Sequence, residues 1–294
     1  NVAVEIDSGG VTLGTAAQSM TLQRGDNNTV TIAQSDFDTS FDTDNDGLTN
    51  LAELLRGTNP GSSIDVVIDR VATAPLIDGS LNEAVWRNRL SQNNRLTIDK
   101  LILADEGDSQ ITTDGLLSAW SMVTDGETLF IAVRLIDQSI QFDSRSEWWK
   151  DDGIELFLDG DNSKQSGGYD RENDYHFNFR VGDARLIRGA RSLSIPSNLV
   201  YEMSADGFDS DIASSAFAAD IDQNGAIDAG FNLEIAIPLD EVEIDEGEAF
   251  GLNLHYNDDD NGGERDSKYS WTGDRGIDID YLEPSALATV LIEE

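Results

Sequence analysis

Acidic and amide residues alternate through the segment FDTDNDGLTNLAELLRGTNP, residues 41–60. Counted from Asp42, oxygen-bearing side chains stand at the first, third, fifth and ninth positions, glycine at the sixth and Glu53 at the twelfth. This spacing is typical of an EF-hand loop, in which alternate oxygens converge on one calcium ion. The alternative is a solvated acidic turn before a helix. The pattern predicts a calcium site formed by Asp42, Asp44, Asp46, the Leu48 carbonyl, Asn50 and Glu53.

The residues that follow this loop predict a short helix. Leu51, Leu54 and Leu55 would form its apolar face, and Gly57 and Pro60 would end it. With its Gly-Thr-Asn-Pro ending, the segment resembles the thrombospondin type 3 repeats of secreted bacterial proteins. That resemblance implies a calcium-stiffened spacer between modules.

Two later segments also gather oxygen ligands. The stretch DGDNSKQSGGYDREND predicts a second calcium site, with a solvated hairpin as the alternative; its candidate ligands are Asp159, Asp161, Asp170 and Asp174. The stretch ADIDQNGAID begins like an EF-hand loop at Asp220, but Phe231 occupies the closing position, so an Asn-Gly turn is the better interpretation. For NDDDNGGERD, an ion site and a wet loop both stay open.

Charge excludes several kinds of partner. The 294 residues hold 57 Asp and Glu against 19 Lys and Arg, a net charge of −38, which repels nucleic acid and anionic membranes. No run is long enough to cross a membrane as a helix. Cysteine is absent, which leaves bound ions as the available cross-links. There is no initial Met and no signal peptide, so we expect a processed piece of a larger secreted or cell-surface bacterial protein.

Strand patterns dominate the rest of the chain. Residues 1–36 read as strands that belong to a preceding domain or add to the main body, and residues 37–63 as the calcium spacer. Residues 64–294 hold many alternating runs, such as TLFIAVRLID, IELFLDG, YHFNFRVG, NLEIAIP and FGLNLHYND, joined by Gly/Asp/Asn loops. The expected fold is all-β, an antiparallel β-sandwich or jelly roll preceded by the short EF-hand-like loop and helix.

Alternation gives each strand one apolar and one polar face. The polar faces carry His176, Asn178 and Arg180 in one strand, Asn253, His255 and Asn257 in another, and Glu155 and Glu234 in two more. Such a face is either simply wet or a surface for hydroxyl recognition. Trp148 and Trp149 precede the Glu155 strand in a polar loop, and two adjacent Trp cannot both enter a core there. We expect one of them to be exposed and to contact a ligand.

Beyond these local patterns, the chain resembles family 9 carbohydrate-binding modules. The resemblance covers residues 65–294 through motifs in the same order: LIDGSLNEAVWRN, DGETLFIAVRLIDQ, WWKDDGIELFLDGDN, NDYHFNFRVG, GFNLEIAIPLDEV, FGLNLHYNDDDNGGERDSKYSWTG and YLEPSALATVLI. It implies a β-sandwich with structural calcium that holds a sugar between two aromatic rings. The matching rings are Trp149 and Tyr281, the latter in place of the usual Trp, and the matching polar contacts are Glu155, Asn178, Arg180, His255 and Asn257. His255 stands where Gln is usual, and Asn178 and Arg180 are swapped in order.

The resemblance implies a non-catalytic module that binds a neutral polysaccharide or oligosaccharide beside attached catalytic or surface domains. Two alternatives stay open: a structural or adhesive sandwich without sugar binding, and a haem-binding relative of the fold. Haem would need an axial ligand such as Met122, which core filling explains as well. An enzyme is not expected, because no Ser-His-Asp grouping stands out and a carboxylate pair is uninformative among so many acids.

Overall fold

In a computed structural model, the chain divides into two compact units, Asn1–Val66 and Val67–Glu294. The structure describes residues 2–8, 11–18, 37–41, 43, 49–51, 65–91, 95–104, 117–137, 140–144, 146–170, 172–180, 185–188, 196–204, 209–210, 227–228, 230–245, 247–272 and 278–292. Within these residues, no helix is both long and apolar enough to span a membrane.

The first unit is built on a β-hairpin. Strands β1 (Val2–Ser8) and β2 (Val11–Gln18) pair antiparallel, and Thr15 of β2 forms an isolated bridge with Asp38. The sequence pattern found the first of these strands but not the second, whose Gly14 and Ala16–Ala17 weaken the apolar alternation. The other two runs expected as strands in residues 1–36, SMTLQ and NTVTIA, lie outside the described residues.

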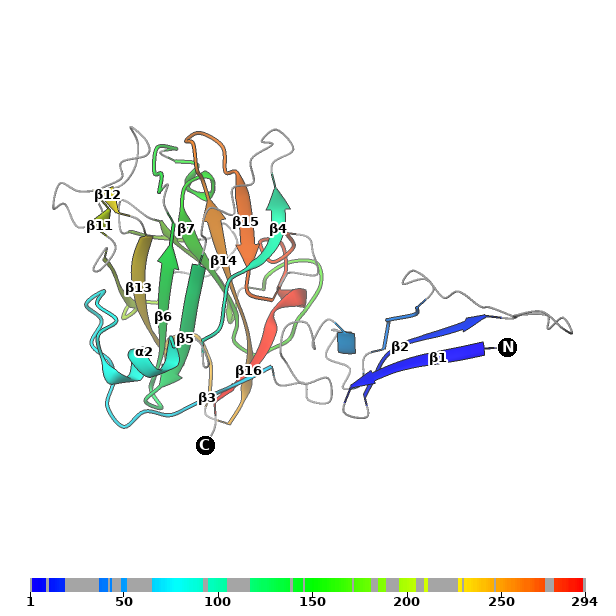
Figure 1. The fold of residues 1–294 in the computed structure, drawn as a ribbon. Helices are drawn as coiled ribbons and strands as arrows, with labels where there is room; N and C mark the ends of the chain where they lie inside the picture. The colour runs from blue at the N-terminus through cyan, green and yellow to red at the C-terminus, as the bar shows by residue number, and fades with distance from the viewer. Residues whose placement is uncertain are drawn as a thin grey trace, which may run out of the picture. The chain divides into compact units, whose positions relative to one another are not determined.

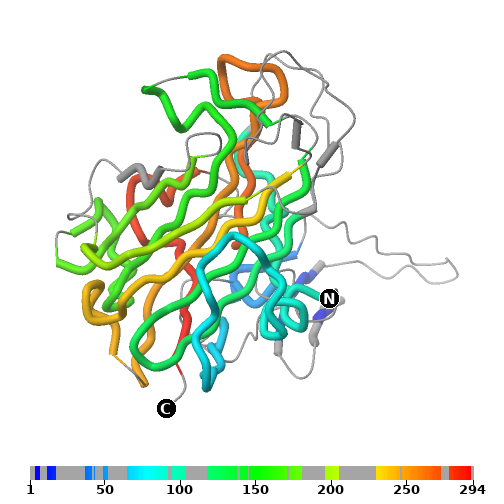
Figure 2. The backbone as a smooth tube through the Cα atoms, turned by 90° about the vertical axis from the view of Figure 1, so that its left-hand side faces the viewer, coloured from blue at the N-terminus to red at the C-terminus, as the bar shows by residue number. Residues whose placement is uncertain are grey.

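The second unit is a sandwich of two main antiparallel sheets, drawn in two views in Figures 1 and 2. The smaller sheet has the order β10-β13-β6-β5. Its strands are β5 (Leu117–Thr124), β6 (Thr128–Ile136), β10 (Val200–Ser204) and β13 (Gly230–Pro238). The expectation of an all-β antiparallel fold is therefore confirmed.

The larger sheet has eight strands. Six follow the order β3-β16-β14-β7-β8-β9, and β15 and β4 continue the sheet beside the far end of β14. Their bounds are β3 (Val66–Ile68), β4 (Lys100–Ala104), β7 (Gly153–Asp159), β8 (Asp174–Arg180), β9 (Arg185–Arg188), β14 (Ala249–Asp258), β15 (Ser267–Ser270) and β16 (Ala288–Ile292). A separate small pair joins β11 (Asp209–Ser210) and β12 (Ile227–Asp228).

The core lies between the two sheets, where the apolar faces meet. Alternate residues of β6 and β13 face those of β7, β8 and β14 and are fully buried, among them Ile131, Leu233, Leu156, Phe177 and Leu254. Met122 of β5 is also buried in this core, as its position in an alternating strand predicted. Stacking two alternating faces in this way buries both without a helix.

One α-helix, α2 (Ala84–Arg89), covers the outer face of the smaller sheet, in front of β5 and β6 in Figure 1. The sequence analysis missed it because six residues are too short for a helical period to show. Its Trp86 packs against Val123, Phe130 and Ala236. Three short 3-10 helices complete the described elements: η2 (Trp148–Lys150), η3 (Leu239–Glu241) and η5 (Pro284–Ala286).

Candidate functional site

The outer face of the larger sheet brings the predicted polar residues together. In the strand register His255 lies opposite Glu155, and Glu155 lies opposite Asn178. One step along the strands, Asn257 and Arg180 flank Gly153 in the next row. All five predicted polar residues thus lie in two adjacent rows across β14, β7 and β8, as the alternation of each strand requires.

This face is buried, so of the two interpretations of its polar residues, the simply wet face is wrong. Each of the five residues is at most 5% exposed. Surrounding loops are tied to one another above the sheet: the Gly167 amide donates to Glu283 Oε2 at 2.6 Å, and the Tyr169 hydroxyl donates to the Asp280 carbonyl. Alternation could not show this, because it reports which face a residue occupies and not what packs against that face.

Charge on the buried face is balanced by Lys268 of β15. Its Nζ lies 2.6 Å from Glu155 Oε2 and 2.8 Å from Asp278 Oδ1, and the side chain is 1% exposed. Burial alone would raise the pKa of Glu155, but Lys268 and His176 outweigh it and hold that pKa well below its ordinary value. Sequence reasoning missed Lys268, although its alternation with the buried Tyr269 and Trp271 was a usable signal.

His255 sits in the same network. Its Nε2 lies 3.1 Å from Asp280 Oδ2, which also accepts from Asn253 Nδ2 at 2.6 Å. Burial, followed by the charge of Lys268, lowers the pKa of His255, and the Asp280 carboxylate opposes that shift. The imidazole is therefore neutral at physiological pH.

An aromatic ring lies at the centre of this polar face. Phe157 is on the same side of β7 as Glu155, stacks on His176 with ring centroids 4.2 Å apart, and contacts the His255 ring at 4.6 Å. It was not among the predicted site residues, although its place two positions after Glu155 puts it on the same face.

The two predicted aromatic rings are exposed beside this face. Trp149 is 41% and Tyr281 47% exposed, and Trp148 packs edge-on against Trp149 with centroids 5.4 Å apart. Arg265 connects the two regions: its Nη1 donates to the Trp149 carbonyl at 3.3 Å and to Asn257 Oδ1 at 2.6 Å, and its Nη2 lies 3.8 Å from Asp278. The exposed Trp expected from the sequence is thus Trp149.

Of the predicted EF-hand ligands, only Asn50 is described. Its Oδ1 accepts from the Thr43 amide at 2.8 Å, and its Nδ2 donates to the Thr12 carbonyl at 2.6 Å. Asp42, Asp44, Asp46, Leu48 and Glu53 lie outside the described residues, so the calcium loop stays a prediction.

The second predicted acidic group is partly assembled. Asp159 and Asp174 are register partners on β7 and β8, and both are fully buried. Burial raises the pKa of Asp159 to about 7. Asp170 and Asp161 are engaged in the turns between the strands, where Asp161 Oδ1 accepts from the Ser163 amide at 3.0 Å and Asp170 Oδ1 accepts from the Glu172 amide at 2.9 Å.

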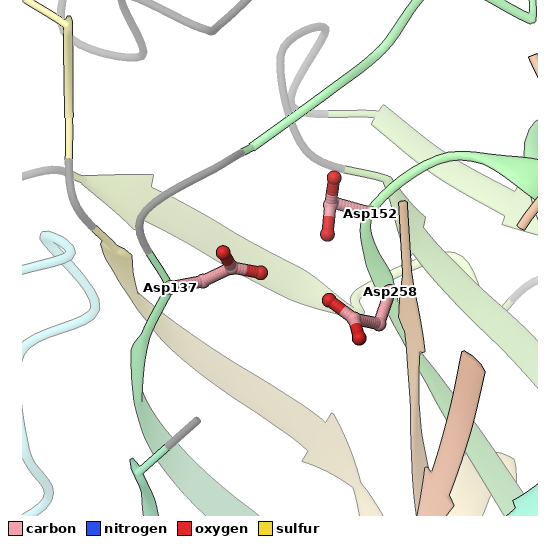
Figure 3. Close-up of side chains that lie close together, drawn as sticks. All are labelled: Asp137, Asp152 and Asp258. Carbon is pink, nitrogen blue, oxygen red and sulfur yellow. The ribbon is translucent and has the colours of Figure 1, made fainter. Parts of the chain in front are cut away.

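A third acidic group joins the two sheets; the sequence indicates only its member Asp258, in the stretch NDDDNGGERD, for which an ion site is one of two open alternatives. Asp137 follows β6, Asp152 precedes β7 and Asp258 ends β14, and Figure 3 shows their carboxyl groups pointing toward one another. One oxygen of each lies within 4.8 Å of the others, and all three residues are buried. The Tyr256 hydroxyl contacts both Asp137 and Asp152. Burial and the Asp137 charge raise the pKa of Asp258 to about 8.

The spacing of this group in the chain explains why the group as a whole was missed. Its members are separated by up to 121 residues, from Asp137 to Asp258, and share no local motif. Its donors are all oxygens, and a set of carboxylate oxygens fits a hard divalent cation such as calcium.

The described fold is an antiparallel β-sandwich with one ion-paired polar face, bordered by exposed aromatic rings. The chain belongs to the carbohydrate family 9 binding domain-like family, whose model matches residues 77–294. This is a family of non-catalytic carbohydrate-binding modules.

Comparison with individual proteins agrees with this family. Exoglucanase XynX of Acetivibrio thermocellus is 24% identical over 226 residues, which are 74% of this chain and 17% of that protein. The chain therefore matches about a sixth of that relative's length. Two structures of a family 9 module from Caldicellulosiruptor kristjanssonii share the fold, each with a TM-score of 0.56. The chain in complex with cellotriose is 12% identical, and the match covers 78% of this chain and 93% of that one. The chain in complex with glucose is 14% identical, and the match covers 78% of this chain and 95% of that one.

Proposed function

We propose that this chain binds a neutral polysaccharide or one of its chain ends on the polar face of the larger sheet, without catalysing a reaction. Trp149 and Tyr281 would stack on the sugar ring, and Glu155, Asn178, Arg180, His255 and Asn257 would hydrogen-bond its hydroxyls. Because these five residues are at most 5% exposed, the sugar reaches them only when the loops joined by the Gly167–Glu283 and Tyr169–Asp280 bonds move apart. The solved relatives in complex with cellotriose and glucose support a glucan as the ligand.

One observation carries the proposal: the buried face holds hydrogen-bonding groups that the described protein leaves unused. Asn178 Oδ1 and Asn257 Nδ2 are buried, and neither has a hydrogen-bond partner in the described part of the chain. An unpartnered buried polar atom costs about 1–3 kcal/mol, so such atoms are rare without a ligand or water. The acceptor on β8 and the donor on β14 are separated by β7, so they suit two different hydroxyls of a sugar, each of which can donate and accept.

Calcium is proposed as the cofactor. The buried oxygens of Asp137, Asp152 and Asp258 fit it, and the ion would supply positive charge between the two sheets. The loop of residues 42–53, with its likeness to thrombospondin type 3 repeats, and the group around Asp159 are further proposed sites. We also propose that the chain is part of a larger secreted or cell-surface bacterial protein, with other domains attached.

The test is calorimetric titration with cello-oligosaccharides in calcium-containing buffer. Trp149→Ala should weaken binding by about 1–3 kcal/mol, by analogy with the stacking of bases on aromatic side chains. Leu76→Ala is the matched control, because Leu76 is 65% exposed and belongs to the segment before α2. Unchanged binding by Trp149→Ala would refute the site. Failure of the parent protein to bind any neutral glycan would favour a structural or adhesive module.

A further inference from the structure

A further acidic group lies at the base of the turn that carries Trp148 and Trp149. One carboxylate oxygen from each of Asp143, Asp151 and Asp259 lies within 4.8 Å of the others. Asp143 and Asp151 stand at the two ends of this turn, and Asp259 begins the loop after β14. The two segments, green and orange at the top of Figure 2, are bonded to each other: Ser144 Oγ donates to the Gly263 carbonyl at 3.0 Å.

Asp259 has one oxygen to spare. Its Oδ1 accepts from the Asn261 amide at 3.1 Å and from the Gly262 amide at 2.6 Å, which fixes the side chain against its own loop. Its Oδ2 is buried and has no hydrogen-bond partner within the described residues, and the whole residue is 0% exposed. A fixed carboxylate with an unused buried oxygen is poised for a ligand that accepts its lone pair.

Within the described residues, cationic side chains balance only part of the charge of this group. Arg180 contacts Asp151 Oδ2, but no described Lys or Arg forms an ion pair with Asp143 or Asp259. Among the described residues, three carboxylates against one guanidinium leave two negative charges, which matches one divalent cation. Burial, with repulsion from Asp143 among the smaller causes, raises the pKa of Asp259 to about 7, so the metal-free group takes up a proton instead.

We propose that Asp143, Asp151 and Asp259 bind a divalent cation, and that this ion fixes the turn carrying Trp148 and Trp149. Calcium fits best, because it accepts irregular sets of carboxylate and carbonyl oxygens drawn from loops. An ion bound at both ends of the turn would restrict the position of Trp149. Its effect on sugar affinity rests on the proposed function, whereas binding of the cation does not.

The experiment compares the calcium stoichiometry of the full chain with that of two isosteric variants, by equilibrium dialysis after chelation. The variants are Asp259→Asn and Asp143→Asn. In each, the side-chain Oδ1 can still accept from the loop amide, Gly262 or Gly263, but the negative charge that would bind the cation is lost. Each variant should bind one calcium fewer per molecule than the parent. The control Glu147→Gln removes an exposed carboxylate of the same turn and should bind as many ions as the parent.

A second readout follows the turn itself. Trp86, Trp120 and Trp271 are buried, so quenching of tryptophan fluorescence by acrylamide reports mainly on Trp148 and Trp149. Calcium should reduce quenching in the parent and in Glu147→Gln but not in Asp259→Asn, and Trp149→Phe should remove most of the calcium response.

The outcomes separate the two proposals. Equal stoichiometry in all four proteins would overturn the cation site, and altered stoichiometry with unchanged quenching would overturn its role in fixing the turn. If the parent binds no cello-oligosaccharide while the stoichiometry still differs, the sugar proposal fails and the cation site stands. Unfolding by urea in chelator checks that the variants fold; we expect their midpoints to equal or exceed that of the parent, because repulsion is relieved.

Discussion

Lys268 is the residue on which the charge balance of the polar face depends. It is buried and contacts two carboxylates, Glu155 at 2.6 Å and Asp278 at 2.8 Å. A buried ion pair contributes little net stability compared with apolar residues, but removing one partner leaves the other charge in a medium of low dielectric constant. The pair therefore holds Glu155 ionised and oriented. It also means that replacing either partner alone destabilises the protein.

We expect Lys268→Met to lower the free energy of unfolding by about 3–5 kcal/mol, since it strands buried carboxylates. The double variant Lys268→Met/Glu155→Gln should recover part of this loss. Lys150→Met is the control: Lys150 also contacts two carboxylates, Glu147 and Glu264, but these are more than half exposed, and surface pairs contribute roughly 0–1 kcal/mol. Urea unfolding measures all three, and equal losses at Lys268 and Lys150 would contradict the argument.

At the scale of the elements, the attachment of α2 and of the residues just before it to the smaller sheet depends on one carboxylate of β13. Glu234 Oε2 accepts from the amides of Gly79 at 2.8 Å and Asp78 at 3.1 Å, and Oε1 accepts from Trp86 Nε1 at 2.8 Å. Gly79 lies at φ +76°, and a Cβ there would come within 2.7 Å of Ser204 Cβ. The Ile-Asp-Gly and Trp of the opening family motif thus attach this segment to the smaller sheet.

Glu234→Ala should destabilise the protein by about 2–4 kcal/mol, because three donors lose their common acceptor and buried donors cost roughly 1–3 kcal/mol each when unsatisfied. Glu202→Ala serves as the control, since Glu202 lies opposite Glu234 in the register but is exposed. Thermal unfolding compares the two; a loss no greater than that of Glu202→Ala would show that the segment is held by apolar packing alone.

Elements with local patterns could be predicted from the sequence, and contacts between distant segments could not. The alternation in β7, β8 and β14 gave the face of Glu155, Asn178 and His255, because side-chain direction in a strand is a local property. The burial of that face depends on loops up to 116 residues away, as in the Gly167–Glu283 contact, and no local pattern encodes it. For the same reason, the stretch NDDDNGGERD indicated an ion site at Asp258 and Asp259 as one of two alternatives, but not their distant partners Asp137 and Asp143.

At the scale of the whole molecule, buried carboxyl groups couple stability to pH and to cations. Burial raises the pKa of Glu234, Asp159 and Asp259 to about 7 and, with the Asp137 charge, that of Asp258 to about 8. Because these values exceed the unfolded ones near 4, the folded state binds more protons between about pH 4 and pH 8. Their stabilising contribution is present at low pH and is lost as the pH rises through this window.

In chelator, the urea midpoint should therefore fall between about pH 5 and pH 8. Calcium should largely restore it at the higher pH, because a ligand that binds the folded state alone stabilises it. Sodium chloride at matched ionic strength is the control for general screening of the −38 net charge. A midpoint that rises with pH in chelator, or equal rescue by sodium and calcium, would contradict this prediction.

Three consecutive residues at the end of β14 belong to three different environments. Asn257 lies in the polar face of the larger sheet. Asp258 belongs to the buried group with Asp137 and Asp152, and Asp259 belongs to the group at the base of the turn that carries Trp148 and Trp149. A slip of one residue in the pairing of β14 would exchange its two faces and misplace all three at once. We therefore expect an insertion or deletion within β14 to disrupt all three environments together. A new ligand preference is better engineered in the surrounding loops, because their lengths can change without changing the strand register.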